Sequence, residues 1–119
     1  GKGPDIARVA EIGGLSKISA SMLRGALDAL VRLDLQQAER TRRDDDRLDK
    51  AYKASVGQLT QLMSESPAAV ATGVQALFAL KSLERIGDHA KNLAEYAVYL
   101  VKGKDIRHVS LEDVERHGL

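Results

Sequence analysis

The sequence predicts an all-α protein, an antiparallel three-helix bundle with a short C-terminal helical tail. Apolar residues recur at spacings of three and four along most of the chain, which is the period of a helix. The breaks between the periodic segments are two or three residues long, as between antiparallel neighbours, and the chain has only two prolines. We expect one domain over residues 1–119, in which 1–4 are a remnant of expression or processing and 104–119 form the tail.

The first predicted helix runs from Asp5 or Ile6 to Leu33. Two neighbouring apolar seams follow this segment, so the helix should contact two partners. One seam consists of Val9, Ile12, Ser16, Ser19, Leu23, Leu27 and Leu30, and the other of Leu15, Ile18, Met22, Ala26 and Leu33. Gly13 and Gly14 each weaken a helix by about 1 kcal/mol relative to alanine, so we expect a break or kink there.

The second predicted helix runs from Leu35 to about Ser64. Asp34 has the character of an N-cap, and Gln37 three residues later completes a capping box. Asp45 falls on the apolar seam of this helix, where an unpaired ionised carboxylate is costly to bury. Either the seam opens to water at Asp45 or a positive group lies beside it.

The third predicted helix runs from Pro67 to Lys102. Ser66 is its expected N-cap, with Pro67 at the first helical position, and Gly103 is its expected C-terminal glycine. Residues 104–108 are predicted to be irregular. Beyond them, Ser110 with Asp113 three residues later predicts one last short helix that ends at Gly118.

The composition narrows the classes of function. A formal net charge of +1 and only four aromatic residues give no support to nucleic-acid binding. The absence of cysteine excludes disulfides and thiolate metal sites and is compatible with a reducing cytoplasm. No apolar run approaches the roughly 20 residues that cross a bilayer, so we expect no direct membrane insertion.

Two pairs of acidic residues stand out as candidate metal ligands. Asp45 and Asp49 are one helical turn apart on the second helix, and Glu84 and Asp88 are one turn apart on the third. Asp49 lies 17 residues before Ser66 and Glu84 lies 18 after it, so the pairs should stand at nearly the same height. Four carboxylates at one level suit magnesium, manganese, iron or zinc.

A plainer interpretation is that Arg47, Arg85 and Lys81 neutralise these acids in surface ion pairs. The arginines of residues 40–47 are interrupted by three aspartates, and we interpret this run as a solvated mixed-charge face. A docking surface for an acidic partner is the alternative, and nucleic-acid binding is a distant third. A di-metal oxygen-using enzyme would need Glu-x-x-His pairs on its inner faces, and the helices have none. No serine lies in a strand-turn-helix context typical of a hydrolase, so we expect no enzyme.

The motifs themselves resemble a known family. Four segments are similar to the C-terminal repeat of the PhoU family. They are the run Glu84-Arg85-Ile86-Gly87-Asp88 with Asn92 and Glu95, the later run Val101–His108, and the upstream segments Ala26–Asp34 and Asp45–Tyr52. The resemblance covers about Leu15 to His108. It implies a three-helix bundle whose Glu/Asp-x-x-x-Asp motifs hold metal ions. Carried over by position, the metal ligands would be Asp45, Asp49, Glu84 and Asp88, with Asn92 a weaker candidate.

The resemblance also implies a cytoplasmic, non-enzymatic negative regulator of phosphate uptake and of phosphate-regulon signalling. Its implied partners are a phosphate transporter ATPase and a membrane sensor histidine kinase. The family usually carries two tandem bundles, and this chain has the length of one. Either an N-terminal half is missing or two copies pair as a homodimer. The alternative function is a structural helical interaction module without a working metal site.

Overall fold

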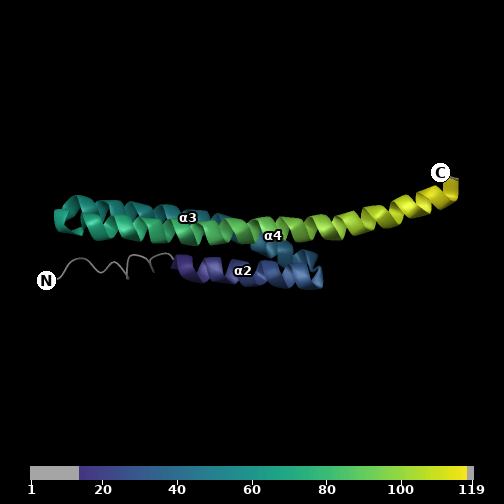
Figure 1. The fold of residues 1–119 in the computed structure, drawn as a ribbon, viewed down its shortest axis with the longest axis horizontal. Helices are drawn as coiled ribbons and strands as arrows, with labels where there is room; N and C mark the ends of the chain where they lie inside the picture. The colour runs from purple at the N-terminus through teal and green to yellow at the C-terminus, as the bar shows by residue number, and fades with distance from the viewer. Residues whose placement is uncertain (1–13, 118–119) are drawn as a thin grey trace.

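The computed structural model describes residues 14–117, and their side chains as far as Gly103. The elements are α2 (Leu15–Arg32), α3 (Leu35–Glu65), a short 3₁₀ turn η2 (Pro67–Ala69) and α4 (Val70–His117). Residues 14–117 contain no strand. The molecule measures 78 × 20 × 17 Å, and Figure 1 shows the chain turning back at each of its two tight connections. The predicted all-α bundle of three helices is therefore confirmed.

The expected start of the first helix at Asp5 or Ile6 lies outside the described residues, and within them α2 begins at Leu15. Gly14 precedes α2 with a left-handed φ of 66°, which agrees with a break at this glycine. At the other end Leu33 is also left-handed, with φ 51° and ψ 46°, and it ends the helix. The Asp34 N–H donates to the Ala29 carbonyl at 3.0 Å across this corner.

The N-cap prediction for the second helix is correct, but the predicted capping box is not formed, because the Gln37 amide oxygen accepts from Arg40 and the Asp34 N–H donates to the Ala29 carbonyl. An Asp34 carboxylate oxygen accepts a hydrogen bond from the Gln37 N–H at 3.1 Å, and α3 follows directly. The capping prediction for the third helix is wrong in detail. The Ser66 side chain makes no capping bond; its carbonyl accepts from the Ala69 N–H at 2.9 Å, so a 3₁₀ turn precedes α4.

The predicted end of the third helix is wrong. α4 passes through Gly103 without a break and continues to His117, so residues 104–108 are helical and no separate helix begins near Ser110. Gly103 does not adopt the positive φ of a C-terminal glycine. One glycine costs a helix only about 1 kcal/mol, and no proline follows Gly103. Because helix formation is cooperative, the helical residues on both sides of Gly103 are sufficient to keep it in the helix.

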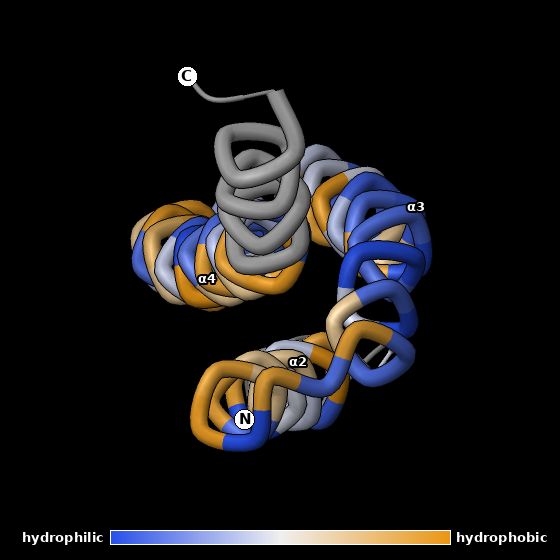
Figure 2. The backbone as a smooth tube through the Cα atoms, turned by 90° about the vertical axis from the view of Figure 1, so that its right-hand side faces the viewer, coloured by the Kyte–Doolittle hydropathy of each residue, from blue (hydrophilic) through white to orange (hydrophobic). Residues whose placement is uncertain are grey.

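The core lies where the three helices meet, and small residues dominate it. Its largest fully buried side chains are Leu15, Met22, Leu48, Leu59 and Leu80, and most of the others are alanines. Figure 2, which looks along the bundle, shows the three helices around a common centre and α3 as the most hydrophilic of them.

Three glycines let the helices approach closely. A Cβ on Gly25 would lie 2.5 Å from the Gln37 amide nitrogen, and a Cβ on Gly73 would overlap Met63. Gly87 is the tightest case, because its Cβ would overlap the buried Leu48 with the Met22 sulfur 3.6 Å away. The three helices thus come together at Gly87, inside the segment that resembles a known family.

Contacts between α3 and α4 follow one register. Residue numbers rise along α3 as they fall along α4. The pairs are Asp45 with Lys91, Leu48 with Gly87, Tyr52 with Lys81, and Met63 with Gly73. This register decides which predicted site residues face each other.

Candidate functional site

Asp45 is the predicted site residue that lies at the boundary between α3 and α4. Its side chain is 25% exposed, and the Lys91 ammonium of α4 lies 3.7 Å from one carboxylate oxygen. The pair borders a surface hollow of about 290 Å³ between the two helices, lined by Glu39, Arg42, Arg43, Asp45, Asp46, Lys91 and Glu95. The acid on the apolar seam therefore has the positive neighbour that its position demanded.

The pKa of Asp45 reflects its burial and the charged groups around it. Partial burial raises the pKa of its carboxyl above the usual 3.8, and the negative charges of Asp88 and Asp46 raise it further. The Lys91 ammonium lowers the pKa by charge and by hydrogen bonding, but burial is the largest single cause and the pKa stays raised. Asp45 on α3 and Asp88 on α4 thus interact across the helix boundary, as the height comparison predicts.

Two of the other predicted ligands, Asp49 and Glu84, have partners on their own helices. Asp49, 52% exposed, pairs with Lys53 one turn along α3 at 3.0 Å. Glu84 pairs with Lys81 on α4 at 2.7 Å. The hydrogen bond and the charge of Glu84 raise the pKa of Lys81, whose ammonium also lies 5.6 Å from the centre of the Tyr52 ring.

Asn92 is exposed on α4, one turn beyond Asp88. The plainer interpretation of the acids holds for Lys81, which pairs with Glu84, while Arg47 pairs instead with Asp44 at 3.4 Å. Lys91 is the residue that the sequence reasoning missed. The sequence nevertheless contained two indications of it. A carboxylate on an apolar seam needs a positive neighbour, and Lys91 lies one helical turn from the level on α4 that should face Asp45.

The donors have the right chemistry for a hard cation, because carboxylate oxygens are what magnesium and manganese prefer. Within the part of the chain whose side chains are described, no three histidine, aspartate or glutamate residues are grouped so as to hold a metal ion. Asp45 and Asp88 supply one interacting pair, and lysines neutralise Asp45, Asp49 and Glu84.

Among the described residues, no helix combines the length and the apolar character needed to cross a membrane.

The family model and the curated relatives that match this chain agree with each other. The PhoU domain family model matches residues 12–97. A phosphate-specific transport system accessory protein PhoU homolog from Pseudomonas aeruginosa is 42% identical over 100 residues, which cover 81% of this chain and 41% of that protein. A homolog of the same name from a Burkholderia species is 41% identical over 102 residues, covering 86% of this chain and 43% of its own length.

The phosphate-specific transport system accessory protein PhoU of Escherichia coli is 37% identical over 102 residues, 86% of this chain and 42% of that protein. The chain thus spans about two fifths of the length of these curated relatives. No solved structure matches it. The matched region contains all five predicted site residues, the Asp45–Lys91 contact and the glycine at which the helices meet. The chain belongs to the PhoU family.

Proposed function

We propose that this chain is a regulatory accessory protein of phosphate transport that works by binding partners and catalyses no reaction. The family match over residues 12–97 carries the proposal. The relatives' shared name, phosphate-specific transport system accessory protein, supports its link to phosphate uptake. In this role it represses phosphate uptake and phosphate-regulon signalling when phosphate is plentiful.

The finer parts of the proposal concern location, assembly and partners. The protein acts in the cytoplasm on a phosphate transporter ATPase and on a membrane sensor histidine kinase, and its antiparallel bundle pairs with a second copy.

A bacterial strain that lacks its own PhoU and carries a phosphate-repressible reporter tests the role. Expression of this chain should restore repression at high phosphate and leave the reporter active at low phosphate. The matched control is Asp28→Asn, which removes only an exposed ion pair with Arg32 on α2. An unrepressed reporter despite normal levels of folded protein contradicts the proposal.

Metal binding on the α3–α4 face is a second part of the proposal. Asp45 and Asp88 would be the ligands that join the two helices, and Asp49, Glu84 and Asn92 would extend the site along them. The mutual effect of the first two carboxylates supports it, because Asp88 raises the pKa of Asp45. A bound iron, zinc, manganese or magnesium ion would supply the positive charge that Lys91 supplies in this structure.

Melting curves of chelator-treated protein test this part. Added manganese, iron or zinc should raise the melting temperature of the wild type and remain bound after desalting, with less gain in Asp45→Asn and Glu84→Gln. Asp28→Asn again serves as the control and should respond like the wild type. An unchanged melting temperature and no retained metal would refute metal binding and favour the second candidate function.

That other candidate is a structural helical interaction module. The lysine partners of Asp45, Asp49 and Glu84 favour it, because each acid already has a cation. On this reading Asp45→Asn melts at the same or a higher temperature than the wild type at every metal concentration.

A further inference from the structure

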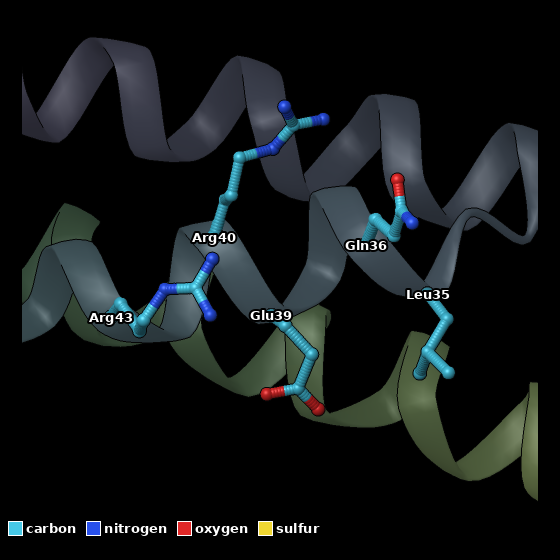
Figure 3. Close-up of a pocket in the computed structure, with 5 residues that line it drawn as sticks. All are labelled: Leu35, Gln36, Glu39, Arg40 and Arg43. Atoms are coloured by element: carbon cyan, nitrogen blue, oxygen red, sulfur yellow. The ribbon is translucent and has the colours of Figure 1, made fainter.

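A second hollow lies on the first turns of α3, next to the α2–α3 connection. Its volume is about 450 Å³, and its lining residues are Leu35, Gln36, Glu39, Arg40 and Arg43. Figure 3 shows Arg40 extending on the α2 side, Glu39 extending on the α4 side, and the Arg43 guanidinium reaching along α3 between them. Helical spacing places Leu35, Glu39 and Arg43 in one row, each one turn from the next.

The charges in this hollow are unevenly compensated. The Glu39 carboxylate accepts hydrogen bonds from Arg42 at 3.0 and 3.3 Å, so its charge is already paired. Arg40 donates at 2.9 Å only to the neutral amide oxygen of Gln37. Within the described part of the chain, the Arg43 side chain forms neither an ion pair nor a hydrogen bond. Two guanidinium groups on one helix face therefore lack a carboxylate partner.

Apolar side chains are exposed at one end of the hollow and around the α2–α3 connection. Leu35, at one end of the hollow, is 38% exposed, and Val31, on the last turn of α2, is 84% exposed. Leu33 in the connection is exposed as well. A surface that combines unpaired guanidinium groups with exposed leucines suits a partner with carboxylates and apolar side chains in one short stretch.

We propose that this hollow docks an acidic, leucine-bearing segment of a partner protein. Its carboxylates would pair with Arg40 and Arg43, and an apolar side chain would rest on Leu35. Nucleic acid fits less well, because the net charge is only +1 and Glu39 lines the same hollow. The inference rests on the proposed regulatory role, since an accessory protein acts through the proteins that it binds.

Fluorescence anisotropy with a short labelled peptide of alternating glutamate and leucine tests the surface on the full chain. The wild type should bind this peptide and not its glutamine-for-glutamate counterpart, and added salt should weaken the binding. The double variant Arg40→Gln/Arg43→Gln should bind about tenfold more weakly, as expected for the loss of two exposed ion pairs. Glu39→Gln should bind more tightly, because it removes the negative charge from the hollow.

Arg47→Gln is the matched control, because Arg47 is an exposed arginine of α3 outside this hollow, and it should bind like the wild type. Circular dichroism confirms that each variant is folded. Equal binding of the glutamine peptide, equal weakening in Arg47→Gln, or displacement of the peptide by inorganic phosphate or an oligonucleotide at lower concentration overturns the proposal. Repression in the reporter strain without peptide binding refutes this surface alone, whereas peptide binding without repression refutes the regulatory role alone.

Discussion

Replacement of Gly87 by alanine tests the close packing at the centre of the bundle. Two effects oppose each other. Alanine favours a helix interior over glycine by about 1 kcal/mol. The new Cβ would, however, overlap Leu48, which is 1% exposed, and would lie 3.6 Å from the Met22 sulfur. Overpacking of a filled core costs about 1–3 kcal/mol. The difference between these two effects predicts a net loss of up to about 2 kcal/mol.

The measurement is urea and thermal unfolding followed by far-ultraviolet circular dichroism. Each kcal/mol lost should lower the melting temperature by about 4 °C in a chain of this length. Gly57→Ala is the matched control. Gly57 is an exposed glycine within α3, and a Cβ there meets nothing within 4 Å, so this change should stabilise the protein by about 0.4–1 kcal/mol.

A double variant separates overlap from other causes. Leu48→Ala alone should cost about 2–5 kcal/mol, because it leaves a cavity in the core. On that background Gly87→Ala should no longer destabilise, which appears as a coupling energy of about 0.5–3 kcal/mol. If Gly87→Ala raises stability as Gly57→Ala does, the close approach of the helices at this point is refuted.

Three further predictions concern charge, capping and core. Burial raises the pKa of Asp45 in the folded protein, so its contribution to the free energy of unfolding falls as the pH rises from 3.8 through the folded pKa. Asp45→Asn should therefore melt higher than the wild type at pH 7 in metal-free buffer, with a smaller difference below pH 4; a lower melting temperature at pH 7 would show that the Lys91 contact outweighs burial. Asp34→Ala should cost about 1 kcal/mol in urea unfolding, since it removes the α3 cap, and an unchanged midpoint would contradict this. Leu59→Ala, fully buried, should cost about 2–5 kcal/mol in the same assay, whereas Val31→Ala, largely exposed, should stay within about 0.5 kcal/mol.

The parts of the fold that local chemistry controls were predictable from the sequence. The α3 cap depends on Asp34 and on the backbone N–H three residues later, so the residues alone indicate it. Likewise, Asp45 on an apolar seam demanded either water or a positive group, and Lys91 meets that demand. Short connections indicated a bundle, because they leave little room for other arrangements.

Features that depend on tertiary contacts or on long cooperative segments were not predictable. Gly103 looked like a helix end, but a glycine ends a helix only when it takes the left-handed conformation, and here it does not. Gly87 lies in the segment read for its charges, and its packing against Leu48 appears only once three helices are placed together. The lysine partners of Asp49 and Glu84 were likewise one choice among many nearby cations.

The corner at Leu33 gives the bundle a weak point. A left-handed backbone costs a residue with a side chain about 1–2 kcal/mol, and this exposed leucine regains little of it through packing. The corner retains that strain because the cap of α3 and the Asp34–Ala29 hydrogen bond hold it closed. We therefore expect α2 to separate from α3 and α4 first at Leu33. The hollow lined by Leu35, Arg40 and Arg43 lies next to this corner, so a partner bound there should hold α2 and α3 together.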